Sequence, residues 1–348
     1  MHSNDILVLR GHEVLTLLTG REDELMDAVG AAYVAHAKGK SSLPHSTFLH
    51  FPDAERNRII ALPSYLGDSF DVAGLKWIAS FPGNYDLGLD RASAVMIMNS
   101  AQTGFPTAIM EGSIISAKRT AASAALAART VHGCEQVDVV GLIGCGLINF
   151  EIARFLRAAC PEASALLVYD VDQSRARQFK EKCGEIASGL EVTVATELEM
   201  VLRQASIVSF ATTAIAPHIS DLGGCPPGST ILHVSLRDLK PEVILACDNV
   251  VDDISHVSRA LTSIHLTEQL CGNSDFIRCT LADILMGIAP ARIDAARTVV
   301  FSPFGLGVLD LVVGKFVYER ALKEKLGTVI DSFLPAPWTQ KWKIESAA

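Results

Sequence analysis

Short apolar runs and one amphipathic helix make up the first third of the chain. The helix is predicted over residues 22–38, where Leu25, Val29 and Tyr33 recur at helical spacing and Gly39 follows as a C-cap. The β-like runs cover residues 6–9 and, after the helix, 58–66, 73–80, 93–100 and 106–112. Because the last four follow one another without an intervening helix, they predict an antiparallel or mixed sheet.

The pattern changes to an alternation of strands and helices in the second part of the chain. An alanine-rich segment, 113–131, is a strong helix former and bridges the two patterns. Strands are then predicted over residues 137–144, 165–170, 191–196, 206–212, 229–235, 249–253 and 298–303. Helices are predicted over residues 147–159 and 173–187, and a last helix over 307–326. This alternation predicts a parallel sheet with helices on both faces.

Together the two patterns predict an α/β fold with two domains. The first is an N-terminal α+β domain with a mixed sheet, over residues 1–125, joined by the C-terminal segment 315–348. The second, over residues 126–314, is a Rossmann domain with a doubly wound parallel sheet.

Composition narrows the classes of function. The 348 residues are 49% hydrophobic, and no segment has the ~20 uninterrupted apolar residues of a membrane span. The net charge of −9 argues against a nucleic-acid partner. The first five residues lack the basic and apolar regions of a signal peptide. We therefore expect a soluble, cytoplasmic protein that contacts neither membrane nor nucleic acid.

The cysteines and histidines do not form a metal-binding pattern. No two of the eight cysteines form C-x-x-C, and the ten histidines include no H-E-x-x-H or H-x-x-x-H pair. We therefore expect no metal site. Without an export signal, we also expect the cysteines to be free and to pack as small apolar residues.

The stretch "VVGLIGCGLINFEIARFL", residues 139–156, has the outline of a phosphate-binding loop. It passes from a strand through glycines into an amphipathic helix. Gly144 would allow the tight turn, and Gly146 would let the backbone approach a pyrophosphate at the helix N-terminus. Asn149 occupies the place of the third glycine, which fits a helix that stands slightly off the strand. A plain strand, turn and helix is the alternative interpretation.

An acidic residue at the end of the next strand favours the cofactor interpretation. Asp170 follows the glycine loop by about two dozen residues, where a carboxylate accepts hydrogen bonds from the ribose hydroxyls. A carboxylate there favours NAD over NADP, because it repels a 2′-phosphate. Arg175 and Arg177 lie one turn further on and would argue for NADP, but we interpret them as a solvated helix face.

Four motifs resemble the ornithine cyclodeaminase/mu-crystallin family. They are "GLKWIAS" (74–80), "TGFPTAIMEGSIISAKRTAASAALAA" (103–128), "GLIGCGLI" (141–148) and "FSPFGLGVLDL" (301–311). The longer pattern "GLKWIASFPGN…GLDRASAVMIMN" resembles the family's branch in 2,3-diaminopropionate biosynthesis, which serves siderophores and other secondary metabolites.

The resemblance implies roles for several residues. It implies a first domain that binds an amino-acid substrate and forms a homodimer, and a second, Rossmann domain that binds NAD or NADP. Lys76 and Arg119 match the residues that hold the substrate carboxylate, and Asp238 matches the aspartate that faces the substrate amine. The cyclodeaminases have a further basic residue where this chain offers His45 and His50.

Charge and expected burial also indicate binding roles for Lys76, Arg119 and Arg91, but each of these residues has a structural alternative. Lys76 lies in an apolar strand, where burial is costly unless an anion pairs with it, or else it points to solvent from an edge strand. Arg119 lies on the alanine-rich helix and binds substrate or pairs with Glu111 or another internal carboxylate. Arg91, in "GLDRASAV", binds substrate or pairs with Asp90 or Asp86. Three cations at one site suit a substrate with several carboxylates.

The resemblance implies a specific reaction. A hydride leaves the glutamate Cα of a glutamate–diaminopropionate secondary amine for NAD+, and water then releases 2-oxoglutarate and L-2,3-diaminopropionate. Asp238 and Lys76 are the predicted catalytic residues, with Lys76, Arg91, Arg119 and His45 as the predicted substrate-binding residues. The predicted cofactor-binding residues are Gly144, Gly146, Leu147, Ile148, Asp170, Thr120, Ser235 and Gly305.

Two other functions stay open at this point. An ornithine cyclodeaminase or a ketimine/imine reductase would use the same hydride chemistry on a smaller substrate, although Arg91 and the "SFPGN" loop favour the larger one. A non-catalytic, nucleotide-gated binding protein of the mu-crystallin type is disfavoured by the charges of Lys76, Arg91 and Arg119.

Overall fold

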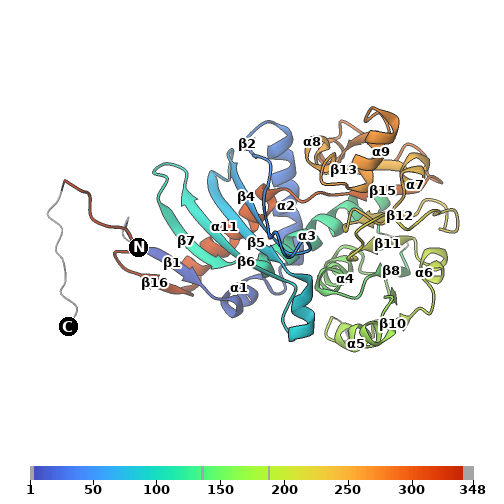
Figure 1. Ribbon diagram of the computed structural model, residues 1–348, viewed down its shortest axis with the longest axis horizontal. Helices are drawn as coiled ribbons and strands as arrows, with labels where there is room; N and C mark the ends of the chain where they lie inside the picture. Colours follow the sequence, from blue (N-terminus) through green and yellow to red (C-terminus); the bar gives the residue numbers. More distant parts are fainter. Residues whose placement is uncertain (1–3, 135–136, 187–188, 340–348) are drawn as a thin grey trace. The chain divides into compact units, whose positions relative to one another are not determined.

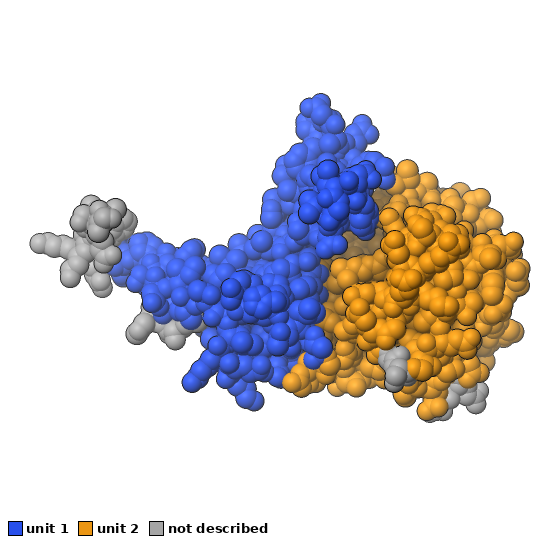
Figure 2. All heavy atoms as spheres, turned by 90° about the horizontal axis from the view of Figure 1, so that it is seen from below, with its two compact units in different colours: residues 1–19, 41–115, 310–348 blue, residues 20–40, 116–309 orange. Residues whose placement is uncertain are grey.

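A computed structural model describes residues 4–134, 137–186 and 189–339 (Figure 1). The expectation of no signal peptide rests in part on Met1, His2 and Ser3, which lie outside these ranges. The chain forms two compact units (Figure 2). Unit 1 comprises Met1–Thr19, Ser41–Ile115 and Asp310–Ala348, and unit 2 comprises Gly20–Lys40 and Ser116–Leu309. The boundaries of folding domains after residues 125 and 314 stay a prediction.

Unit 1 is built on a mixed sheet. Its described strands are β1 (Ile6–Leu9), β2 (Ser41–Ser42), β3 (Thr47–His50), β4 (Arg58–Leu66), β5 (Val72–Ser80), β6 (Ala92–Ser100), β7 (Pro106–Glu111) and β16 (Thr328–Ile330). They pair in the order β16-β1-β7-β6-β5-β4-β2, and β3 also pairs with β4. Only the β1–β7 pair among these is parallel. The predicted mixed sheet is therefore confirmed.

The part of helix α11 (Gly307–Glu324) that lies in unit 1 packs on this sheet. A Cβ on Gly74 of β5 would lie 2.9 Å from Leu311, and a Cβ on Gly314 would lie 2.7 Å from Met96 of β6. Glycine therefore allows the helix and the strands to approach closely on this face. Helix α1 (Gly11–Leu18) was not predicted, because its eight residues are too few for a clear helical period.

Unit 2 is built on a parallel sheet. Its described strands are β8 (Val139–Ile143), β9 (Ala165–Tyr169), β10 (Glu191–Val194), β11 (Ile207–Phe210), β12 (Thr230–His233), β13 (Asp248–Val251), β14 (Ile277–Thr280) and β15 (Val299–Ser302). Their order is β10-β9-β8-β11-β12-β15-β13-β14, and every pair is parallel. The first five strands have the Rossmann order 3-2-1-4-5, which confirms the predicted fold class.

Helices cover this sheet (Figure 1). The described helices of unit 2 include α2 (Glu22–Ala37), α3 (Ser113–Ala127), α4 (Leu147–Ala159), α5 (Gln173–Cys183), α6 (Leu198–Gln204), α7 (Pro241–Ala246), α8 (Ile254–Val257), α9 (Ser263–Cys271) and α10 (Leu281–Leu285), with α3 beginning in unit 1. Gly141 of β8 lets α6 pack closely, because a Cβ there would lie 2.5 Å from Val201. The helix predicted over 113–131 is α3, and a π-helical turn, Ala128–His132, continues it.

A disulfide joins Cys134 and Cys160, so the expectation that all cysteines are free was wrong. Cys134 follows the π-helical turn and Cys160 caps the end of α4, which brings their Cα atoms within 4.7 Å. This proximity arises from tertiary packing and leaves no spacing signal in the sequence. No described group of three or more His, Cys, Asp or Glu side chains is arranged to hold a metal ion. Among described residues no helix is long and apolar enough to cross a bilayer.

Candidate active site

The glycine loop of unit 2 begins with a turn that requires glycine. Gly144 has φ of 94°, and a Cβ on it would lie 2.5 Å from the carbonyl oxygen of Ala211. The Gly144 N–H donates to the carbonyl of Tyr169 at 2.8 Å, which ties the loop to the neighbouring strand. The backbone therefore turns sharply where β8 ends, as a phosphate-binding loop requires.

Helix α4 presents its N-terminus at this loop. Gly146 is the N-cap, and a Cβ built on it meets no atom within 4 Å. Leu147 is exposed and Ile148 is partly exposed in the first turn. The first N–H groups of a helix have no partner within the helix, and they favour an anion in front of them. The open space and the donors fit the pyrophosphate of a dinucleotide.

Asn149 replaces the third glycine by tying the loop to the sheet. Its side chain is fully buried and donates to the carbonyls of Ile143 at 2.9 Å and Gly144 at 2.7 Å. Its Oδ1 accepts a hydrogen bond from Ser209 of β11 at 2.7 Å. The Asn149 amide thus satisfies two loop carbonyls and one hydroxyl. Its hydrogen bonds hold the helix against the strand, as close packing does where the third residue is glycine.

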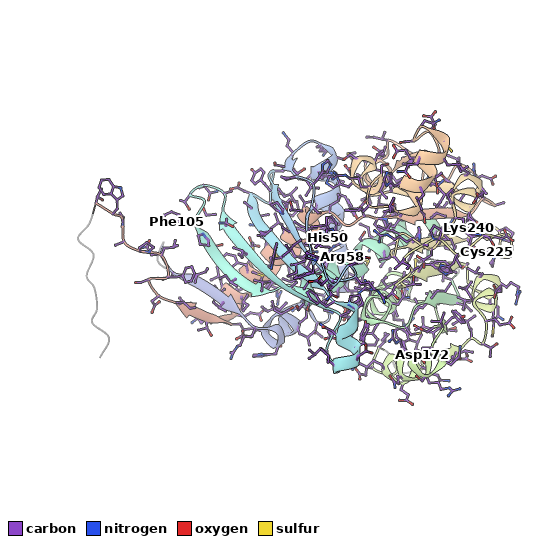
Figure 3. All side chains as sticks on the ribbon, in the orientation of Figure 1. His50, Arg58, Phe105, Asp172, Cys225 and Lys240 are labelled. Atoms are coloured by element: carbon purple, nitrogen blue, oxygen red, sulfur yellow. A yellow bond between two sulfur atoms is a disulfide. The ribbon has the colours of Figure 1, made fainter. Side chains whose placement is uncertain are left out.

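Asp170 lies directly after β9, beside the glycine loop. One carboxylate oxygen accepts from the Cys145 N–H at 2.8 Å, and the other accepts from the Asp172 N–H at 3.0 Å. Each oxygen keeps a lone pair, so the carboxylate can still accept a ribose hydroxyl. Asp172 caps the start of α5 (Figure 3). On that helix Arg175 is partly buried and Arg177 is exposed.

Asp238 lies in the loop after β12 within a buried polar cluster. Thr212 donates to its Oδ1 and Ser235 donates to its Oδ2. The Ser235 hydroxyl is also 3.0 Å from the Phe210 carbonyl, at the end of β11. Burial acts to raise the pKa of Asp238, but hydrogen bonds from His233, Ser235 and Thr212 outweigh it and hold that pKa below its usual range. Asp238 is thus held as a carboxylate.

His233 supports Asp238 from the strand itself. Its Nε2 lies 3.2 Å from the Asp238 N–H and 3.3 Å from the Asp238 carboxylate, and its Nδ1 lies 3.3 Å from the Ser302 hydroxyl. Nε2 accepts the backbone N–H when it lacks a proton, or donates to the carboxylate when it carries one. The same loop holds Leu236 at φ of 67°, a backbone conformation that costs of order 1–3 kcal/mol.

Asp252, at the end of β13, organises the turn at Gly305. It is buried and accepts hydrogen bonds from the N–H groups of Phe304 at 2.9 Å and Gly305 at 2.7 Å. Burial raises the pKa of Asp252, although these bonds act against it. Gly305 has φ of 92°, and a Cβ on it would lie 2.6 Å from Nη1 of Arg119. Asp252 was not predicted as a site residue. Its signal in the sequence is the pair of acidic residues, Asp252 and Asp253, that directly follows the apolar strand β13.

These groups of unit 2 share one edge of the parallel sheet. Because β8, β9, β11, β12, β13 and β15 run parallel, their carboxyl ends lie along the same edge. Gly144, Asp170, Asp238, Asp252 and Gly305 each follow one of these strands. Ligands of open α/β sheets bind at this edge. The predicted Thr120 lies on α3, where its hydroxyl donates to the carbonyl of Ser116 at 2.7 Å.

In unit 1, Lys76 is buried at the centre of the sheet. It lies on β5, between β4 and β6, and its ammonium is 2.8 Å from the Asp310 carboxylate of α11. The two side chains are 3% and 1% exposed, so the alternative of a solvent-directed lysine on an edge strand was wrong. Asp310 was not predicted, because the pairing joins elements more than 200 residues apart.

The other predicted residues of unit 1 have different surroundings. Arg91 is half-buried, and its Nε donates to the Ser80 hydroxyl at 3.2 Å. Glu111 accepts from the N–H groups of Ser113 at 2.6 Å and Ile114 at 3.0 Å, and so caps the start of α3. His45 lies on an exposed loop between β2 and β3. The roles assigned to these residues from the sequence stay predictions.

A family comparison covers most of the chain. The model of the ornithine cyclodeaminase/mu-crystallin family matches residues 6–325. The chain belongs to this family, and the resemblance found in the sequence is confirmed.

Several relatives resemble nearly the whole chain. The N-((2S)-2-amino-2-carboxyethyl)-L-glutamate dehydrogenase of Staphylococcus aureus is 27% identical over 88% of this chain and 93% of its own length. The Δ1-pyrroline-2-carboxylate reductase of Thermococcus litoralis, solved with NADH and L-proline, has a TM-score of 0.84 at 26% identity and covers 93% and 99% of the two chains. An archaeal alanine dehydrogenase dimer with bound NAD has a TM-score of 0.83 at 28% identity and covers 94% and 99%.

Proposed function

We propose that the protein is an NAD-dependent dehydrogenase that cleaves a secondary amine, the N-((2S)-2-amino-2-carboxyethyl)-L-glutamate of its S. aureus relative. The observation that carries the proposal is the shared sheet edge of unit 2. There, a phosphate-binding loop follows β8 and a buried aspartate with a lowered pKa, Asp238, follows β12, on the two sides of β11. A hydride acceptor bound at the loop and Asp238 as the proton acceptor would therefore both lie at this edge of the sheet.

NAD fits the residues that would hold it. Gly144, Gly146 and the first turn of α4 would bind the pyrophosphate, and Asp170 would accept from the ribose hydroxyls and disfavour a 2′-phosphate. Bound NAD+ supplies a hydride acceptor. The relatives solved with NADH and NAD support this cofactor.

The chain's own residues would handle charge and protons. Asp238 would take a proton from the amine or from the water that attacks the imine. Lys76, Arg91 and Arg119 would neutralise and orient the substrate carboxylates. The balance is substrate, NAD+ and water giving 2-oxoglutarate, L-2,3-diaminopropionate, NADH and a proton. We further propose a cytoplasmic homodimer in a siderophore or other secondary-metabolite pathway, with the alanine dehydrogenase dimer as support for the assembly.

A second candidate function is imine reduction or cyclodeamination of a smaller substrate. The likeness to the T. litoralis reductase over nearly the whole chain favours it. Arg91 favours the larger substrate, because a half-buried guanidinium is better matched to an additional carboxylate than to the apolar ring of proline.

Absorbance at 340 nm tests the proposal. With NAD+ and the glutamate–diaminopropionate adduct we expect NADH formation with equimolar 2-oxoglutarate. Ornithine, alanine and proline serve as competing substrates in parallel assays. Ornithine turnover is followed as proline and ammonia, because cyclodeamination gives no net NADH. Turnover of one of these substrates, with none of the adduct, would replace the proposal with the corresponding smaller-substrate activity. Enhanced NADH fluorescence without turnover of any amino acid would make the protein a nucleotide-gated binder.

Substitution of Asn149 tests how the cofactor loop is held. Asn149→Ala removes three hydrogen bonds from buried groups, so we expect it to lower the free energy of unfolding by about 1–3 kcal/mol. We also expect the Kd for NADH to rise about tenfold, because the loop carbonyls lose their anchor. Urea unfolding and NADH fluorescence titration measure the two effects.

Asn249 provides the matched control in the same sheet. It is buried on β13 and its amide donates to three carbonyls, those of Ile244, Cys247 and Phe276. Asn249→Ala should cost similar stability and leave the Kd for NADH unchanged. Equal changes of NADH affinity in both variants would mean that Asn149 acts through general stability and does not organise the loop.

A further inference from the structure

Three arginines gather at one end of the mixed sheet of unit 1. Arg58 begins β4 and lies opposite His50, the last residue of β3, and opposite Ser80, the last residue of β5. His50 and Arg58 lie beside each other in Figure 3. Ser80 accepts the hydrogen bond from Arg91, and Arg56 lies two residues before Arg58. We call Arg56, Arg58 and Arg91 the arginine cluster.

Arg58 and Arg91 are partly buried and Arg56 is exposed, and the positive charges of the three act on one another. Burial lowers the pKa of Arg91, and the charges of Arg58 and Arg56 lower it further, while Tyr85 acts in the opposite direction. Asp86 and Asp90, the partners considered from the sequence, are exposed. Like charges that lie close together repel one another, and desolvation of a guanidinium adds to this cost. Perturbed charges of this kind are typical of binding sites.

The loop that carries Arg91 is fixed in place. The Phe81 N–H donates to the Arg91 carbonyl at 2.8 Å, and the Asn84 amide donates to the Asp90 carbonyl at 2.9 Å. Phe81 also meets Phe51 edge to face, with ring centroids 5.4 Å apart. The cluster therefore has a constrained backbone and aromatic side chains nearby, which suits a ligand that joins an anionic group to methylene groups.

Arg58 and Lys76 lie on one face of the sheet. Side chains alternate along a strand, so Lys76 and Ser80 of β5 point to the same side, and Arg58 shares it because it lies directly opposite Ser80. Four residues along a strand span about 13 Å. Long lysine and arginine side chains at the two ends of this distance can hold two anionic groups of one small molecule.

We infer that the arginine cluster is a specificity subsite that binds the second carboxylate of a dicarboxylic amino-acid substrate, at a distance from the carboxylate held by Lys76. This inference rests on the proposed function and names the substrate class that the site selects. A guanidinium matches a carboxylate with two parallel hydrogen bonds, and the group it binds offsets the mutual repulsion of the arginines. A phosphate has the same binding chemistry, so the test includes it.

The test compares ligands that need no turnover. Glutarate and pentanoate have the same number of carbons and differ by one carboxylate, and inorganic phosphate is the third probe. Ligand-observed NMR titrations of the full chain with NADH give the three Kd values. We expect glutarate to bind roughly ten- to a hundredfold more tightly than pentanoate, because its second carboxylate can accept hydrogen bonds from charged donors.

Variants assign the preference to the cluster. Arg58→Gln and Arg91→Gln should each reduce the glutarate preference at least fivefold and leave the Kd for NADH unchanged. The same variants should raise KM for the adduct more than they lower kcat. Arg10→Gln is the matched control, because Arg10 is an exposed arginine of unit 1 that pairs with Glu13, and it should change neither value.

The outcomes separate this inference from the proposed function. Three results would each overturn the inference, even if the adduct is oxidised. They are equal binding of glutarate and pentanoate, tighter binding of phosphate than of glutarate, and a changed Kd for NADH in the variants. A glutarate preference that depends on Arg58 and Arg91 supports the subsite. It does so even when the adduct gives no NADH, a result that would refute only the proposed function.

Discussion

Asp238→Asn should lower kcat/KM for the oxidised substrate about a thousandfold, within the range of 10²–10⁴ that a general acid–base group contributes. The amide keeps the size of the side chain and can still meet Thr212 and Ser235, but it cannot take a proton. The Kd for NADH should stay within a factor of about two, because the glycine loop is built by other residues. Steady-state kinetics and NADH fluorescence measure both.

The matched control is another buried aspartate of the same sheet. Asp248 of β13 pairs with Arg278 at 2.7 Å and is 3% exposed, and it lies at the beginning of its strand, away from the carboxyl edge. Asp248→Asn should lower stability and leave kcat/KM nearly unchanged. If Asp238→Asn and Asp248→Asn reduced activity equally, Asp238 would have a structural role only.

The lowered pKa of Asp238 also fixes the sign of its pH effects. A carboxylate whose pKa is below its usual range is ionised at neutral pH, so Asp238 should not limit activity there. Its contribution to stability is fully present above the unfolded-state pKa and is lost as the pH falls through the lower, folded-state pKa.

The sequence was most informative where local pattern and local chemistry coincide. The strands Arg58–Leu66 and Pro106–Glu111 and the helix Leu147–Ala159 lie within one residue of their predicted ends, because apolar period and turn residues agree there. Gly144, Gly146 and Asp170 were found for the same reason. Their spacing along one strand–turn–helix–strand unit already specifies their geometry.

What the sequence did not reveal depends on contacts between distant segments. Three contacts of the site each join residues at least 50 positions apart. They are the contacts of Asp310 with Lys76, of Ser209 with Asn149 and of Asp252 with Gly305. The short strands Ile277–Thr280 and Thr328–Ile330 were also missed, because three or four residues carry little periodicity and neither is a fully apolar run like residues 6–9. These elements form only when a neighbouring strand supplies their hydrogen bonds.

Lys76→Met should lower the free energy of unfolding by about 3–5 kcal/mol, because it leaves the Asp310 carboxylate buried without its ion-pair partner. Urea unfolding measures this loss. Lysine has three donors, so the Asp310 pair does not prevent Lys76 from also binding a substrate carboxylate. The single variant should therefore lose both stability and activity, and it does not separate the two roles.

The double variant Lys76→Met, Asp310→Leu separates them. Replacing a buried ion pair with apolar residues of similar volume is often neutral for stability, so most of the lost free energy should return. If Lys76 binds the substrate carboxylate, activity should stay lost in this stable variant, with KM raised at least a hundredfold, because no cation remains at that position. A stable double variant with near-normal KM would show instead that Lys76 serves only to pair with Asp310, and carboxylate binding would then have to come from the arginines.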